Sequence, residues 1–140
     1  MFIAEKDKGA YLNGKKITVN NFENPSDALL AAAFPIRDFD HLEQYFNLQY
    51  NLIQQVHDIR RLGSAAMDLC YVACGRFDAY CELGLKIWDI AAGALILTEA
   101  GGEITDWRGG KSFWETGSFV ATNTKLHKWM LGEIEKHYFK

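Results

Sequence analysis

Cysteine is scarce in this sequence, and its arrangement excludes a disulfide-stapled fold. The three cysteines, Cys70, Cys74 and Cys81, are an odd number, which argues against a disulfide framework. Cys70 and Cys74 lie one helical turn apart, but no histidine or further cysteine stands at a spacing that would complete a zinc site. We therefore expect reduced thiols in the core and a cytoplasmic location.

An excess of basic residues is also missing. The formal net charge is −3 at pH 7, so the sequence has no electrostatic footprint for nucleic acid or for an acidic membrane surface. No apolar run reaches the length of a membrane span, and no signal-peptide pattern opens the sequence. Repeats and low-complexity tracts are absent as well, and residues 1–140 fit one domain. We expect a protein that binds neither nucleic acid nor a membrane.

What the sequence does contain is an alternation of strand-like and helix-like segments. Residues 1–20 read as strands with a hairpin turn at Asn13-Gly14. Apolar runs predict further strands at 29–34, 56–60 and 76–81, around Ile104, and at 119–121. Helical spacing predicts helices over 39–53 and 64–74, from Asp89 onward, and after Asn123 or Thr124. This alternation indicates a layered α/β domain.

One carboxylate, Asp89, stands at the start of an apolar segment. Residues 91–97 carry no polar side chain, so the helix that begins here should be buried on all sides, with Gly101-Gly102 ending it. A carboxylate at the positive end of a buried helix is either a structural N-cap or a ligand-binding group, and spacing alone favours the cap. As an N-cap, Asp89→Asn should cost little stability, and Asp89→Ala about 1 kcal/mol.

A second candidate site lies at the start of another apolar helix, at Gly63-Ser64-Ala65. The free backbone N–H groups of a first helical turn can bind oxygen-rich ligands, and glycine lets a ligand approach the backbone closely. The alternative is an ordinary serine cap on a packed helix, which the residues alone favour. Asp68, one turn later, interrupts an otherwise apolar helix, and we expect it to pair with Arg60 or Arg61.

Three motifs together resemble the inositol monophosphatase family of magnesium-dependent phosphomonoesterases. They are Arg61-Leu62-Gly63-Ser64-Ala65-Ala66, Asp78 through Lys86, and Trp88-Asp89 through Glu99-Ala100-Gly101-Gly102. The resemblance implies a mixed sheet packed by helices, the C-terminal half of the sugar-phosphatase fold. It also implies Mg²⁺ as cofactor with Asp89 as a metal ligand. Gly63, Ser64, Ala65 and Glu82 are then the residues that bind a small phosphorylated polyol or sugar.

The resemblance matches only the second half of such an enzyme. A Glu-Glu pair and an Asp-Pro-(Ile/Leu)-Asp-Gly-Thr loop, which carry the other metal ligands in the family, are absent. The opening residues, Met1 to Ala4, also read as a strand with no lead-in. We therefore expect residues 1–140 to be the C-terminal domain of the enzyme, with the N-terminal domain absent. Hydrolysis of inositol monophosphate or a related polyol phosphate is then expected only with that half present, because a lone carboxylate holds Mg²⁺ at about millimolar or worse.

Two alternatives stay open from the sequence. The first is a non-catalytic binding or scaffolding module that kept the fold. The second is a hydrolase that completes its site across a dimer, although a second copy would not contribute the missing carboxylates. In either case we expect a homodimer, or association through the surface left by the missing half.

Overall fold

A three-stranded antiparallel sheet begins the computed structural model, which describes residues 1–35 and 39–140. The strands run in the order β1 (Phe2–Glu5), β2 (Gly9–Leu12) and β3 (Lys15–Ile17). Asn13 and Gly14 join β2 to β3 with φ angles of 50° and 79°. Positive φ at both positions is what a tight hairpin turn requires, so the predicted hairpin is confirmed.

The larger sheet has five strands in the order β5-β4-β6-β8-β7. Its members are β4 (Leu29–Ala32), β5 (Asp58–Arg60), β6 (Ala79–Glu82), β7 (Glu103–Thr105) and β8 (Phe119–Thr122). β4 pairs in parallel with β5 and β6, whereas β8 pairs antiparallel with β6 and β7. The mixed sheet and the α/β class are therefore confirmed.

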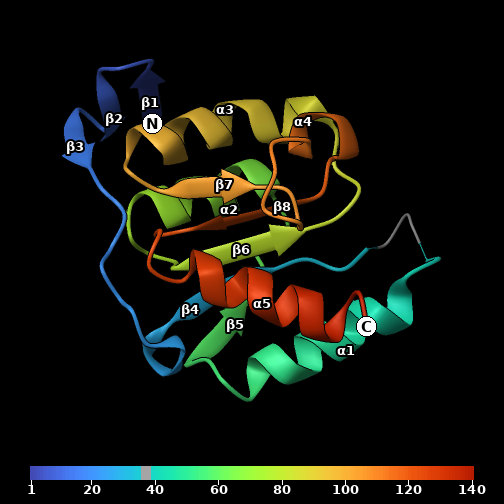
Figure 1. Ribbon diagram of the computed structural model, residues 1–140. Coiled ribbons are helices and arrows are strands. Elements are labelled where there is room, and N and C mark those ends of the chain that lie inside the picture. Colours follow the sequence, from blue (N-terminus) through green and yellow to red (C-terminus); the bar gives the residue numbers. More distant parts are fainter. Residues whose placement is uncertain (36–38) are drawn as a thin grey trace.

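Helices cover both faces of this sheet (Figure 1). They are η1 (Pro25–Asp27), α1 (Leu42–Ile53), α2 (Ala65–Ala73), α3 (Ile87–Glu99), α4 (Phe113–Thr116) and α5 (His127–His137). α2 and α3 bury Leu69 and Leu97 on one face, and α1 and α5 bury Leu48 and Met130 on the other. Across residues 1–35 and 39–140, no helix has the length and apolar character needed to cross a membrane.

A glycine sets the close approach of α2 to α3. A Cβ atom added to Gly93 would lie 2.7 Å from the Cβ of Leu69, which is closer than real side-chain contacts allow. The Leu69 side chain of α2 therefore packs directly against the backbone of α3 at Gly93. Protein interiors are packed this closely throughout. This spacing brings their amino-terminal ends to one end of the sheet, where the candidate site lies.

The outer face of α3 is exposed, contrary to the expectation of burial on all sides. Ile87 is 51% exposed, Trp88 75% and Leu95 39%, whereas Ile90 and Leu97 are buried against the sheet. A helix on the outside of a sheet packs through one stripe, so the opposite stripe lies away from the core however apolar it is. α2 differs from the prediction in the same way at Met67, which is 39% exposed.

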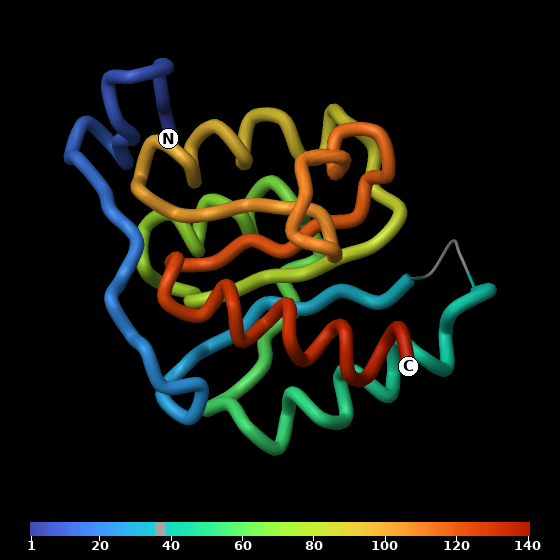
Figure 2. The backbone as a smooth tube through the Cα atoms, in the orientation of Figure 1, coloured from blue at the N-terminus to red at the C-terminus, as the bar shows by residue number. Residues whose placement is uncertain are grey.

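The segment between the two sheets runs down one side of the molecule (Figure 2). Asn20 fastens this segment, since its amide donates a hydrogen bond to Asp78, just before β6. Asn123 in turn donates to the Asn20 side-chain oxygen over 2.7 Å. These amide contacts hold the start of β6 in place, and β6 carries Glu82 at its far end.

Candidate functional site

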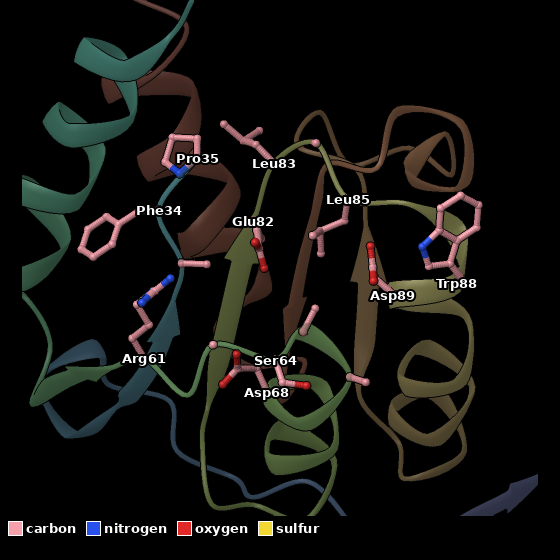
Figure 3. A pocket seen from close by; sticks show the side chains of 15 residues that line it. Phe34, Pro35, Arg61, Ser64, Asp68, Glu82, Leu83, Leu85, Trp88 and Asp89 are labelled. Carbon is pink, nitrogen blue, oxygen red and sulfur yellow. The ribbon is translucent and has the colours of Figure 1, made fainter. Parts of the chain in front are cut away.

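A cavity of about 390 Å³ lies beyond the carboxyl ends of β4 and β6, between the amino-terminal ends of α2 and α3 (Figure 3). Gly63, Ser64, Ala65, Glu82 and Asp89 all line it. Five residues predicted from three separate segments are therefore brought together. Carboxyl ends of strands in an α/β sheet are the usual place for a ligand crevice.

Asp89 occupies the third position of α3, and the prediction that it is the N-cap is wrong. The N-cap is Lys86, whose backbone is extended (φ −98°, ψ 156°). The Lys86 N–H donates to the Asp89 carboxylate over 3.0 Å, and the Asp89 N–H donates to the Lys86 carbonyl oxygen over 2.9 Å. The N-cap lies three residues before the expected one, and the Asp89 carboxylate reaches back to it, as in a capping box. The stability expectation for an N-cap aspartate therefore does not apply in that form.

The start of α2 also differs from an ordinary serine cap. Ser64 is the N-cap residue (φ −141°, ψ 107°), but within the described residues its hydroxyl makes no capping hydrogen bond. Gly63 has φ +84°, and a Cβ atom there would meet nothing within 4 Å. The glycine is thus needed for its backbone conformation, and it leaves open space in front of a helix amino terminus.

Glu82 reaches the cavity from the end of β6 and is held by Tyr80. The buried Tyr80 hydroxyl donates a hydrogen bond to the Glu82 carboxylate. Burial raises the pKa of Glu82; the Tyr80 hydrogen bond and the Arg61 charge lower it, and the Asp89 charge raises it. Glu82 and Asp89 thus feel each other's charge, which makes the space between them attractive to a cation or to hydrogen-bond donors.

Asp68 is a further acid of this cavity that the sequence analysis did not assign to the site. It is 1% exposed and lines the cavity, and its Oδ1 has no hydrogen-bond partner among the described residues. Burial raises its pKa to about 6, the Glu82 charge adds to the rise, and the Arg61 charge opposes it. The sequence signal was there: a carboxylate on an apolar helix, one turn after Gly-Ser.

The predicted pairing of Asp68 with Arg60 or Arg61 is wrong. Arg60 forms an ion pair with Asp58 at the exposed edge of the sheet. The Arg61 guanidinium lies 5.5 Å from the centre of the Phe34 ring. Arg61 lines the same cavity as Asp68, and its charge acts on Asp68, but no ion pair between the two is formed among the described residues.

The described side chains that line this cavity do not form a full set of protein ligands for Mg²⁺. Mg²⁺ is commonly bound through one or two carboxylates, with water and substrate phosphate completing its octahedral shell. Asp89 supplies such an oxygen at the mouth of the cavity. Over residues 1–35 and 39–140, no group of three or more His, Cys, Asp or Glu side chains is placed to hold a metal.

Comparison with known proteins identifies the family of this chain. The model of the inositol monophosphatase family matches residues 1–138. Nus factor SuhB of Pseudomonas aeruginosa is 46% identical over 138 residues, which cover 97% of this chain and 51% of that protein. Nus factor SuhB of Escherichia coli K12 is 40% identical over 134 residues, covering 96% and 50%.

Solved structures agree with the sequence comparisons. Extragenic suppressor protein suhB from Bartonella henselae superposes with a TM-score of 0.92 and 35% identity, covering 96% of this chain and 52% of that chain. Inositol monophosphatase from Anabaena superposes with a TM-score of 0.89 and 33% identity, covering 97% and 54%. The chain thus spans about half the length of the proteins that it matches. On the family match, the identities and the superpositions, the chain belongs to the inositol monophosphatase family.

Proposed function

We propose that this chain forms the polyol-binding half of a magnesium-dependent phosphomonoesterase site. The substrate class is inositol monophosphate or a related polyol or sugar phosphate. One observation carries the proposal: the glycine-serine turn of α2, Glu82 of β6 and Asp89 of α3 line a single cavity. These groups are acceptors and helix N–H donors, which suit a ligand with hydroxyl groups at one end and a phosphate at the other.

Each group has a role that follows from its chemistry. Asp89 holds Mg²⁺ together with phosphate oxygens, and Glu82 accepts a hydrogen bond from a ring hydroxyl. Ser64 and the first-turn N–H groups of α2 bind further ligand oxygens. When bound, the metal neutralises the phosphate and lowers the pKa of a bound water.

Hydrolysis requires more than these residues supply. One metal-binding carboxylate leaves the shell of Mg²⁺ mostly to water and phosphate, so the ion is held weakly. We therefore assign ligand binding to this chain and turnover to the site completed by the other half of the family fold. Association as a homodimer, or through the surface left by the missing half, belongs to the same proposal.

Asp89→Asn should abolish the magnesium dependence of ligand binding. We expect wild type to bind inositol 1-phosphate more tightly with Mg²⁺ than without, and the variant to lose about tenfold or more, the worth of one charge-assisted contact. Isothermal titration calorimetry measures this, and Asp27→Asn is the matched control because Asp27 is exposed in η1, outside the cavity.

Phosphate release by the same proteins distinguishes a half site from a whole one. We expect no turnover by either protein alone. Turnover by wild type that disappears in Asp89→Asn would show that a complete site forms without the other half. Equal magnesium dependence in both proteins would remove Asp89 as a ligand.

A second candidate function is a binding role in the transcription machinery, suggested by the name Nus factor of the curated relatives. This role would add a protein partner to the small-molecule ligand expected from the sequence. The exposed apolar side chains of α3, Ile87, Trp88 and Leu95, offer a surface of the kind that contacts another protein.

Leu95→Glu should weaken any such complex, since it places a charge in the apolar face of α3. Sedimentation velocity with purified RNA polymerase compares wild type, Leu95→Glu and Asp89→Asn. Binding that Leu95→Glu loses and Asp89→Asn keeps would separate this role from the phosphatase site. If wild type does not bind the polymerase, the second candidate is excluded.

A further inference from the structure

Asp68 is the buried acid that the proposed roles leave unused. Its Oδ1 has no hydrogen-bond partner within the described residues, although the side chain lies at the wall of the cavity. Burying a charged or polar group without a partner is unfavourable, so such a group in a native fold calls for an explanation.

The other buried aspartates of this fold show how such groups are normally satisfied. Asp78 accepts hydrogen bonds from the Leu29 N–H over 2.7 Å and from the Asn20 amide. Asp106 accepts four hydrogen bonds, from the N–H groups of Arg108, Gly110 and Ser112 and from the Ser112 hydroxyl. Asp68 differs from both, because its buried Oδ1 has no hydrogen-bond partner among the described residues and the residue lies in the wall of a ligand-sized cavity.

The surroundings of Asp68 indicate what its carboxyl group meets at the cavity wall. Side chains on a helix tilt toward its amino terminus, so the carboxyl group of Asp68 lies over the first turn of α2, beside Ser64 (Figure 3). Glu82 points into the same cavity from β6, and its charge acts on Asp68. Asp68 and Glu82 therefore border the cavity from two different elements, with Arg61 beside them, and Asp89 borders it from the start of α3 (Figure 3).

We propose that Asp68 is a specificity-determining residue that binds one ring hydroxyl of the polyol, next to the hydroxyl bound by Glu82. The proposal rests on the proposed function and deepens it. A carboxylate oxygen accepts the hydroxyl proton, and the hydroxyl oxygen stays free to accept a hydrogen bond from an N–H at the start of α2. A polyol with two neighbouring hydroxyls satisfies both acids, whereas a ligand that lacks one leaves an acid buried and unpaired. Such a site rejects deoxy analogues strongly.

The test uses monodeoxy analogues of inositol 1-phosphate, each lacking one ring hydroxyl, titrated calorimetrically at saturating Mg²⁺. For wild type we expect affinity to fall about 10- to 100-fold at two neighbouring ring positions, as for hydrogen bonds to charged groups. Asp68→Asn should become insensitive at one of these positions, and Glu82→Gln at the other. Asp27→Asn removes the same charge outside the cavity and should keep both penalties.

The outcomes separate this proposal from the one that it rests on. If wild type binds inositol 1-phosphate and Asp68→Asn keeps the wild-type penalty at every position, the role of Asp68 is overturned and the proposed function stands. If wild type binds inositol 1-phosphate but distinguishes no analogue, the role of Asp68 and the ring-hydroxyl contact of Glu82 are both overturned. If wild type fails to bind inositol 1-phosphate at all, the proposed function is overturned and the role of Asp68 with it. Circular dichroism confirms that each variant is folded.

Discussion

Gly117→Ala should lower the free energy of unfolding by about 3 kcal/mol or more, the largest effect that we expect from a single methyl group in this fold. Gly117 ends α4 with φ +68°, where a side chain is strained. A Cβ atom there would lie 1.8 Å from the carbonyl oxygen of Leu85 and 2.8 Å from its carbonyl carbon and nitrogen. These are backbone atoms, so the clash cannot be relieved by turning a side chain.

The clash would also break a contact that supports the cavity. The Leu85 N–H donates to the Gly117 carbonyl oxygen over 3.0 Å, and Leu85 lies in the cavity wall between β6 and α3. Moving Leu85 therefore disturbs the segment that joins Glu82 to Asp89. We expect Gly117→Ala to weaken ligand binding as well as the fold.

Gly101→Ala is the matched control for this substitution. Gly101 has φ +85°, but a Cβ atom there would meet nothing within 4 Å. It should cost only the strain of a left-handed residue, about 1–2 kcal/mol. Thermal unfolding should then show a clearly larger drop for Gly117→Ala, on the order of 10 °C. Equal melting temperatures for the two variants would contradict the close approach to Leu85.

The sequence predicted those elements whose signals are local. The turn at Asn13-Gly14 is readable because few residues accept positive φ, and both predicted positions have it. The apolar run at 29–34 contains β4, and the run at 119–121 covers all of β8 except its last residue, Thr122. Short-range chemistry decides such features, and the packing of the domain does not override it.

The candidate site was predicted through the family motifs rather than through spacing. Spacing alone favoured structural caps at Ser64 and Asp89, and neither is a side-chain N-cap in the structure. The N-cap is the last residue with a non-helical backbone before the first helical turn, here the extended Lys86. The tertiary fold sets the dihedral angles of that residue. The predicted site residues therefore line one cavity, whereas the capping roles that spacing favoured for Ser64 and Asp89 are not those in the structure.

Long-range contacts lay outside what the sequence could show. Glu99 has an unfavourable charge near the end of α3, and it is satisfied by the N–H groups of Asp7 and Gly9 over 2.9 and 2.8 Å, some 90 residues away. Asp68 shows the reverse case, because neither of the two arginines close to it in the sequence forms an ion pair with it among the described residues. Apolar composition likewise did not reveal which side of α3 faces away from the core. Which side of a helix other elements cover depends on how the whole domain packs.

Asp68→Asn should make the protein more stable at neutral pH, by about 1–3 kcal/mol. The pKa of Asp68 is about 6 in the native state against an ordinary 3.8. Between these values the native protein binds the proton more tightly than the unfolded chain does. The contribution of Asp68 to the free energy of unfolding therefore falls as pH rises from about 4 to about 6, and stays low above that.

The difference between wild type and Asp68→Asn isolates this contribution. Other groups with shifted pKa values, such as Asp78 and Asp106, are present in both proteins and largely cancel. Glu82 is the exception, because the Asp68 charge is no longer there to interact with it in the variant. Urea unfolding at a series of pH values should show no advantage of the variant near about pH 4 and the full advantage above about pH 6.

Stability and specificity at Asp68 should move in opposite directions. If the Asp68 charge had no role in ligand binding, its replacement by Asn would leave ligand binding unchanged. A buried charge that binds the ligand lowers the stability of the fold and is needed to recognise the ligand. A more stable Asp68→Asn protein that no longer discriminates one deoxy position would be the signature of a functional acid. A variant less stable than wild type above about pH 6 would mean that the native fold depends on a partner of Asp68, and the ligand would no longer be needed to explain this carboxylate.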